Sequence, residues 1–196
     1  MTYLKDRFPI PEMEEAAIAY LAHYSNTETG LRRVLEGRLR RWVMRVKKQG
    51  MDESEINDVV NRLQDSITDV IKKMKKIGAV NDESYAQQKT SSLIRTGNSK
   101  NAIRTKLLSK GVNQDIIQSA LEVVSGTDSE LFAGLIYARK RRIGPFKLQN
   151  KEITDEDKRK AQMRMIRAGF SSNIIRELFQ LSHSEAEEII YNFKAL

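Results

Sequence analysis

The sequence predicts an all-α fold: a tandem array of three three-helix repeats that forms an elongated, curved molecule. Three observations lead to this prediction. Apolar residues recur at helical spacing, as in the five-turn stripe from Ile56 to Met74, and no segment alternates with a period of two. The 196 residues include only three prolines and ten glycines, so little interrupts long helices. Short motifs also recur along the chain in a fixed order.

Capping residues divide the chain into helices. Amide and hydroxyl side chains that favour helix N-caps precede the apolar-periodic segments, at Asn81, Asn98, Asn113, Thr154 and Ser171. Glycines follow many of these segments, where helices commonly end. The predicted helices cover residues 12–24, 28–48, 53–77, 82–96, 99–109, 114–125, 129–142, 155–168, 172–180 and 184–194.

Two motifs recur between the middle and the last third of the chain. The segment Glu83-Ser84-Tyr85-Ala86 recurs 47 residues later as Glu130-Leu131-Phe132-Ala133. The segment Lys110-Gly111-Val112-Asn113 recurs 58 residues later as Ala168-Gly169-Phe170-Ser171. The change in offset predicts an 11-residue insertion, placed in residues 145–153.

A third copy lies upstream, because Asn26-Thr27 and Leu31-Arg32 match Asn98-Ser99 and Ile103-Arg104, 72 residues on. We therefore predict a first repeat over 12–77 with an insertion near 39–66, a middle repeat over 78–126, a third over 127–182, and an extra C-terminal helix over 183–196. Gly50-Met51-Asp52 offers the alternative of a simple turn instead of an insertion. Units of about 50 residues bury little core alone, so neighbours should stack into a long surface for a long partner.

Basic residues are segregated along the chain, whose net charge is +8. Three stretches, 32–48, 72–76 and 139–147, together carry +16, and the remaining residues sum to −8. This segregation suits a polyanionic partner, either a phosphate backbone or an acidic protein groove.

Enzyme chemistry finds little support in the sequence. Cysteine is absent and the two histidines, His23 and His183, are far apart, so no metal or cofactor site is expected. No phosphate-binding glycine motif and no nucleophile–base constellation occurs. No apolar run is long enough to span a membrane, and residues 1–10 lack a signal pattern, so we expect a cytoplasmic protein.

The middle repeat carries several motifs in a fixed order. Gly78-Ala79-Val80-Asn81-Asp82-Glu83 precedes the aromatic-Ala pair Tyr85-Ala86, and Arg95-Thr96-Gly97 and Lys110-Gly111-Val112 follow. In these motifs the middle repeat resembles the RecX family of regulators of the bacterial recombinase RecA. Tyr20 through Leu35 resembles the family's N-terminal module, and Arg159 through Arg176 its C-terminal one. The chain departs from the family pattern over residues 39–66 and in the tail from His183 onward.

This resemblance implies an inhibitor of RecA without a catalytic site of its own. Such proteins are expected to lie along the groove of the RecA–DNA filament and to suppress ATP hydrolysis, extension and strand exchange. The expected partners are the RecA filament and single- or double-stranded DNA, bound weakly when alone, and we expect a monomer. Two alternatives remain open: a helical DNA-binding protein that acts alone, with helix 114–125 reading bases, and a protein-interaction adaptor.

The candidate contact residues for the filament or DNA lie in two basic stretches, where Arg offers a bidentate fork to phosphate and carboxylate. They are Arg32, Arg33, Arg38, Arg40, Arg41, Arg45, Lys47, Lys48, Arg139, Lys140, Arg141 and Lys147. A competing interpretation makes Arg95 and Arg142 cations of helix C-termini. The aromatic residues Trp42, Tyr85, Phe132 and Phe146 are expected in the core rather than stacked on bases.

Overall fold

The computed structural model describes residues 8–123, 127–147 and 154–194, and these residues form ten α-helices, one 3₁₀ turn and no strand. The all-α prediction is therefore confirmed. The predicted helix ends agree with the observed ones to within about three residues, the first helix ending at Leu21 rather than at residue 24. The predicted insertion over 145–153 lies largely outside the described residues.

Two compact units divide the chain. The N-terminal unit comprises the described part of Met1–Tyr85 together with Lys110–Val112, and the C-terminal unit comprises Ala86–Ser109 and the described part of Asn113–Leu196. The division of the chain into three repeats remains a prediction.

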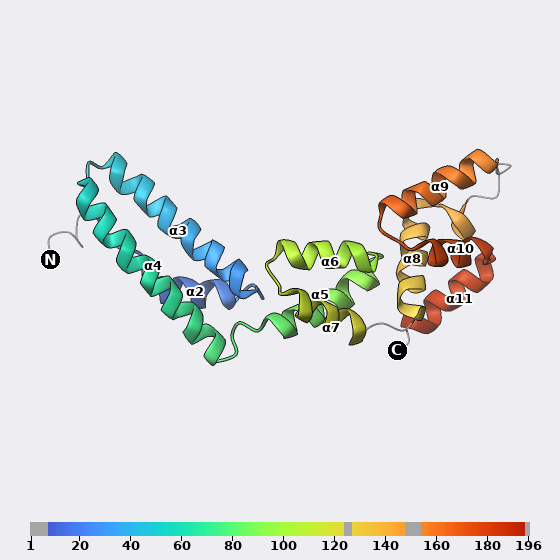
Figure 1. The fold of residues 1–196 in the computed structure, drawn as a ribbon, viewed down its shortest axis with the longest axis horizontal. Coiled ribbons are helices and arrows are strands. Elements are labelled where there is room, and N and C mark those ends of the chain that lie inside the picture. The colour runs from blue at the N-terminus through green and yellow to red at the C-terminus, as the bar shows by residue number, and fades with distance from the viewer. Residues whose placement is uncertain (1–7, 124–126, 148–153, 195–196) are drawn as a thin grey trace. The chain divides into compact units, whose positions relative to one another are not determined.

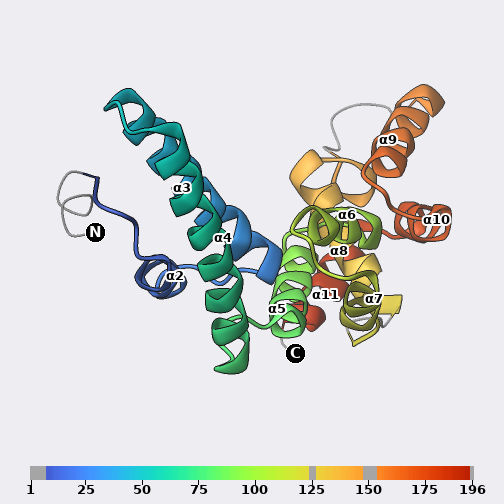
Figure 2. The same ribbon diagram turned by 60° about the vertical axis from the view of Figure 1, so that its left-hand side comes forward.

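A helical hairpin forms most of the N-terminal unit. Helices α3 (Glu28–Lys48) and α4 (Glu53–Lys76) lie side by side in both views, and α2 (Met13–Leu21) packs against both (Figures 1 and 2). The inner face of α3 is apolar, because its buried side chains recur every three or four residues. They are Leu31, Leu35, Leu39, Trp42 and Val46.

The hairpin turns at Gly50-Met51-Asp52. Residues 39–66 form no separate inserted element, since they run through the second half of α3, this turn and the first half of α4. Gly50 has φ +80°, and the Asp52 carboxylate accepts the Ser54 N–H at 2.8 Å as the N-cap of α4. The 21 residues of α3 and the 24 residues of α4 thus account for nearly all of this segment.

The C-terminal unit is organised around α8 (Thr127–Arg141), which is buried along most of its length and packs against α10, α11 and the 3₁₀ turn η1. Phe132 on α8 is 1% exposed and stacks on Phe193 with ring centroids 4.1 Å apart. The other elements are α5 (Asp82–Arg95), whose first turn belongs to the N-terminal unit, α6 (Lys100–Ser109), α7 (Gln114–Val123), η1 (Gly144–Phe146), α9 (Asp155–Arg167), α10 (Ser172–Gln180) and α11 (His183–Lys194).

The recurring sequence motifs contact one another at two equivalent junctions. The Thr27 hydroxyl, at the N-cap of α3, donates to the Lys110 carbonyl at 2.6 Å and accepts the Gly30 N–H at 2.9 Å. The Ser99 hydroxyl donates in the same way to the Ala168 carbonyl at 2.7 Å and accepts the Ala102 N–H at 3.1 Å. Each hydroxyl therefore caps a helix and also makes a tertiary hydrogen bond. Both residues are fully buried.

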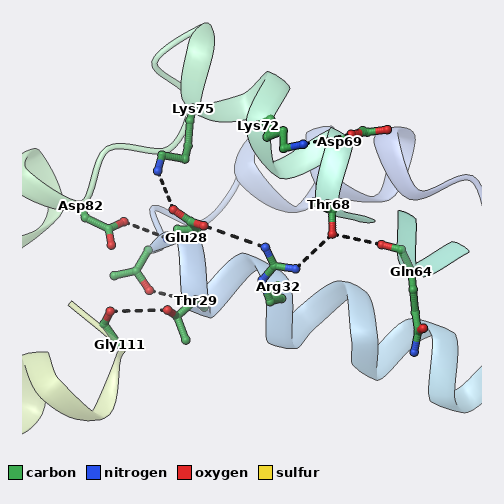
Figure 3. A network of polar contacts seen from close by, with 12 residues as sticks. Glu28, Thr29, Arg32, Gln64, Thr68, Asp69, Lys72, Lys75, Asp82 and Gly111 are labelled. Atoms are coloured by element: carbon green, nitrogen blue, oxygen red, sulfur yellow. Dashed lines mark hydrogen bonds and ion pairs between the residues drawn. The ribbon is translucent and has the colours of Figure 1, made fainter. Parts of the chain in front are cut away.

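A second hydrogen bond lies beside each junction, and its donor is the residue two positions after the capping Thr or Ser. Thr29 donates to the carbonyl of Gly111 at 3.4 Å (Figure 3), and Asn101 donates to that of Gly169 at 3.2 Å. A Cβ on Gly111, whose φ is +79°, would lie 2.4 Å from the Cβ of Thr29, so this approach requires glycine.

Two local predictions need correction. Asn98 is not the N-cap of α6, because Ser99 caps that helix and the Asn98 amide donates to the Leu93 carbonyl at the end of α5. Arg142 does not lie in the last turn of a helix as Arg95 does, because α8 ends at Arg141. Its φ of +53° places Arg142 in the left-handed region.

Candidate polyanion-binding surface

One face of α3 carries most of the predicted contact residues. Because successive residues turn by about 100°, side chains opposite the buried apolar stripe point away from the hairpin. This α3 basic face consists of exposed cations from two turns after the N-cap to the last turn: Arg33, Arg38, Arg40, Arg41, Arg45, Lys47 and Lys48.

Four members of this face have no acidic partner among the described residues: Arg38, Arg41, Arg45 and Lys48. Arg40 approaches Glu36 at 3.9 Å, and Lys47 pairs with Glu53 at 3.2 Å. Exposed pairs of this kind contribute little to stability, so they exchange readily for another anion.

A glycine brings two guanidinium groups together on this face. Nitrogens of Arg41 and Arg40 lie 3.6 and 3.7 Å from the position that a Cβ would take on Gly37. Two planar forks over one bare stretch of backbone form a local concentration of N–H donors, which suits phosphate or carboxylate oxygens.

Arg32, in contrast, belongs to a polar network inside the N-terminal unit (Figure 3). Its guanidinium lies 3.9 Å from the Glu28 carboxylate and 3.5 Å from the Thr68 hydroxyl on α4. Glu28 also accepts a hydrogen bond from Lys75 at 2.6 Å, and this bond raises the pKa of Lys75. The Asp82 carboxylate accepts the Glu28 N–H at 2.8 Å. Arg32 therefore connects α3 to α4.

The second basic stretch is largely taken up by contacts inside the C-terminal unit. Arg139 pairs with Glu187 of α11 at 3.3 Å, and Lys140 donates to the Thr96 carbonyl at 2.9 Å. Arg141 lies over the Tyr137 ring at 5.8 Å from its centroid.

Lys147, the last predicted contact of this stretch, pairs with Asp157 at 3.4 Å. The pKa of Asp157 is lowered, first by its hydrogen bond with Thr154 and then by Lys147. Lys147 and Arg141 line a common cavity of the C-terminal unit.

The aromatic candidates lie in the core or at its edge. Trp42 and Phe146 are 3% and 8% exposed, and the Trp42 indole N–H donates to the Pro9 carbonyl at 3.0 Å. Tyr85 is half-buried, and this burial raises the pKa of its hydroxyl. These side chains do not supply a stacking platform for bases.

The proposed base-reading helix, α7, has its central polar side chain engaged. The Gln118 amide accepts from Arg104 at 3.1 Å and donates to Glu122 at 2.7 Å. Within the described ranges, no group of three or more acidic or histidine side chains could hold a metal ion, and no helix is long and apolar enough to span a membrane.

Sequence reasoning missed a group of cations on α9. Acidic residues at the start of α9 mask them in a charge count, yet Lys160, Arg164 and Arg167 follow the i, i+4, i+7 spacing of one helical face. Counting cations by helical face, rather than by run, would have found them.

Comparisons with known proteins agree on one family. The model of the second three-helix domain of RecX matches residues 81–121. A regulatory protein RecX from Myxococcus xanthus is 36% identical over 167 residues, covering 85% of this chain and 83% of the relative. A regulatory protein RecX from Agrobacterium fabrum is 34% identical over 116 residues, covering 58% and 59% respectively.

The fold is also similar to solved structures. A crystal structure of RecX from Lactobacillus salivarius aligns with a TM-score of 0.58 at 20% identity, covering 90% of this chain and 97% of that one. A second crystal structure of a regulatory protein RecX aligns with the same score and identity, covering 86% and 72%.

Proposed function

This chain belongs to the RecX family of regulatory proteins, and on that premise we propose that it inhibits the RecA recombinase. In this proposal the chain binds along the RecA–DNA filament as a monomer and suppresses ATP hydrolysis, filament extension and strand exchange. The protein acts by occupying the filament and carries out no chemistry itself.

The observation that best supports this proposal is the α3 basic face. Its four unpaired cations, Arg38, Arg41, Arg45 and Lys48, follow the spacing i, i+3, i+7 and i+10. They form a row over three turns of α3, beside the apolar stripe that is held in the hairpin core. A rigid row of cations complements a linear array of phosphates or acidic side chains. Because these four cations have no internal carboxylate partner, none has to be displaced before such an array binds.

Binding of this kind depends on several modest contacts made together. Each exposed ionic contact contributes roughly 0.2–1 kcal/mol, so a single substitution should have little effect. Contacts made together by one folded chain add their free energies without a further association cost. The whole unpaired set therefore has to be removed in one variant.

The test is RecA ATP hydrolysis on single-stranded DNA, with this protein titrated well below one molecule per recombinase protomer. The wild type should inhibit strongly at such ratios. A variant with Arg38, Arg41, Arg45 and Lys48 replaced by Ala should require roughly tenfold more protein for half inhibition. Four lost contacts amount to about 0.8–4 kcal/mol, a range that includes the roughly 1.4 kcal/mol of a tenfold change.

A matched control removes four exposed cations that lie outside the three basic stretches: Arg62, Lys89, Lys110 and Arg176. It has the same net charge as the α3 variant and should inhibit nearly as well as the wild type. Equal loss in both variants would show that net charge matters rather than the α3 basic face. Inhibition that appears only when the DNA itself is saturated would instead favour a DNA-binding protein that acts alone.

A further inference from the structure

The C-terminal unit contains a basic cavity of about 300 Å³, distinct from the α3 basic face. Its walls come from the end of α8, the turn η1, the first half of α9 and the end of α10. Asp157 is the only carboxylate that lines it within the described part of the chain. Six cationic side chains surround that group: Arg141, Arg142, Lys147, Lys158, Lys160 and Arg164.

The positive charge of this cavity is only partly balanced. Lys147 pairs with Asp157 at 3.4 Å, and Lys160 pairs with Glu156 at 2.7 Å. Three of the other cations have no acidic partner in the described structure: Arg142, Lys158 and Arg164. Like charges gathered around one hollow repel each other, and an anion placed among them relieves that repulsion.

The backbone of Arg142 is in a strained conformation, so the position of its charge costs conformational free energy. The ends of α3, α5 and α9 are closed by the same pair of backbone hydrogen bonds as the end of α8. At those three ends the left-handed residue is glycine, whereas at α8 it is Arg142, which has the only positive φ of a non-glycine residue in the described chain. Glycine would adopt this conformation without strain, so the arginine side chain must supply something else.

The lining also includes an apolar wall. Half-buried Phe179 and Pro145 line the same cavity as the unpaired cations. Its volume is at the lower end of the range for small-molecule sites, enough for a phosphoryl group and a flat ring. Arginine forks recognise phosphate oxygens, and an aromatic face stacks on any base.

We propose that this cavity binds one nucleoside phosphate. Its phosphoryl oxygens accept hydrogen bonds from Arg142, Lys158 and Arg164, and its base lies against Phe179. The ligand is either a free nucleotide or the phosphorylated end of a strand, which present the same chemistry to the cavity. This inference does not depend on the recombinase, and its test uses the full chain alone.

The experiment is calorimetric titration of the full chain with ADP, adenosine, a 5′-phosphorylated oligonucleotide, the same oligonucleotide without the phosphate, and an oligo-glutamate peptide. ADP should bind and adenosine should not. Preference for the phosphorylated over the unphosphorylated strand, without ADP binding, would assign the site to strand ends. Absence of binding by every phosphate probe, or equal binding of the peptide, overturns the proposal.

The decisive variant is Arg142→Gly. It should weaken binding of ADP, or of the 5′-phosphorylated oligonucleotide if only that probe binds, at least tenfold, because a charged hydrogen bond is lost. It should also raise Tm by about 2–4 °C, because the backbone strain at position 142 disappears. Arg176→Ala, which removes an exposed cation of α10 outside the cavity, should leave binding within about twofold of the wild type. Equal weakening by both variants overturns the proposal.

Discussion

The hydroxyl of Thr27 provides the sharpest test of how the recurring motifs hold the N-terminal unit together. Thr27→Val keeps the shape of this fully buried side chain and removes both of its hydrogen bonds. Loss of the N-cap bond to Gly30 should cost about 1 kcal/mol. Loss of the 2.6 Å bond to the Lys110 carbonyl should add about 1–3 kcal/mol, because that acceptor is left unpaired. The expected total is about 2–4 kcal/mol.

The single tryptophan makes this measurement specific to one unit. Trp42 is 3% exposed in the core of the N-terminal unit, so its fluorescence during urea unfolding reports on that unit. Thr27→Val should lower the urea midpoint without changing the slope of the transition. Thr27→Ser keeps the hydroxyl and should lose only the smaller contribution of a methyl group, about 0.8 kcal/mol.

A chemically identical control lies in the C-terminal unit. Thr154 caps α9 by accepting the Asp157 N–H at 3.2 Å, but it is exposed and its hydroxyl donates to no carbonyl in the described structure. Thr154→Val, followed by far-UV circular dichroism, should therefore cost only about 1 kcal/mol. A Thr27→Val loss no larger than this would refute the argument that the junction bond stabilises the unit.

Three further predictions follow from the same structure. Gly111→Ala should destabilise the N-terminal unit by more than Gly50→Ala does, as measured by Trp fluorescence during urea unfolding. Both substitutions introduce left-handed strain of about 1–2 kcal/mol, but only the Cβ at position 111 also clashes with Thr29. Equal losses of stability in the two variants would contradict this prediction. The pKa of Asp52 is lowered by its hydrogen bonds from Ser54, so the cap should persist as pH falls to 3.8 and be lost below it. An NMR titration midpoint for this carboxyl at or above 3.8 would contradict this prediction. The variant lacking the four unpaired α3 cations should lower the log-log salt slope of single-strand binding by up to about 3, and an unchanged slope would exclude DNA contact by that face.

The helices could be predicted from the sequence because their causes are local. Apolar spacing identified the buried stripe of α3 and α4, and the predicted capping side chains of Asn113, Thr154 and Ser171 lie at the helix starts that the structure shows. The predicted end of α8, residue 142, lies one residue beyond the observed end at Arg141. A left-handed arginine is rare, so nothing in the sequence marks Arg142 as the residue that ends the helix.

The candidate site was predictable only in part, because a charge run does not reveal the partners of its members. Arg38, Arg41 and Arg45 remain without acidic partners, but Arg139 pairs with Glu187, which is 48 residues away in the chain. The basic cavity gathers residues from four elements, and no single stretch of sequence carries its pattern. Such pairings depend on which faces of distant helices meet.

The sequence alone determined the helical content, the order of the elements and the recurring motifs, since helix periodicity, capping and turn preferences act within a few residues. Only the tertiary structure decided that the motifs bond to one another, through Thr27 to Lys110 and Ser99 to Ala168. It also decided which cations stay unpaired and which side chains surround a cavity. These outcomes depend on packing between segments 69 to 83 residues apart, where local propensity carries no information.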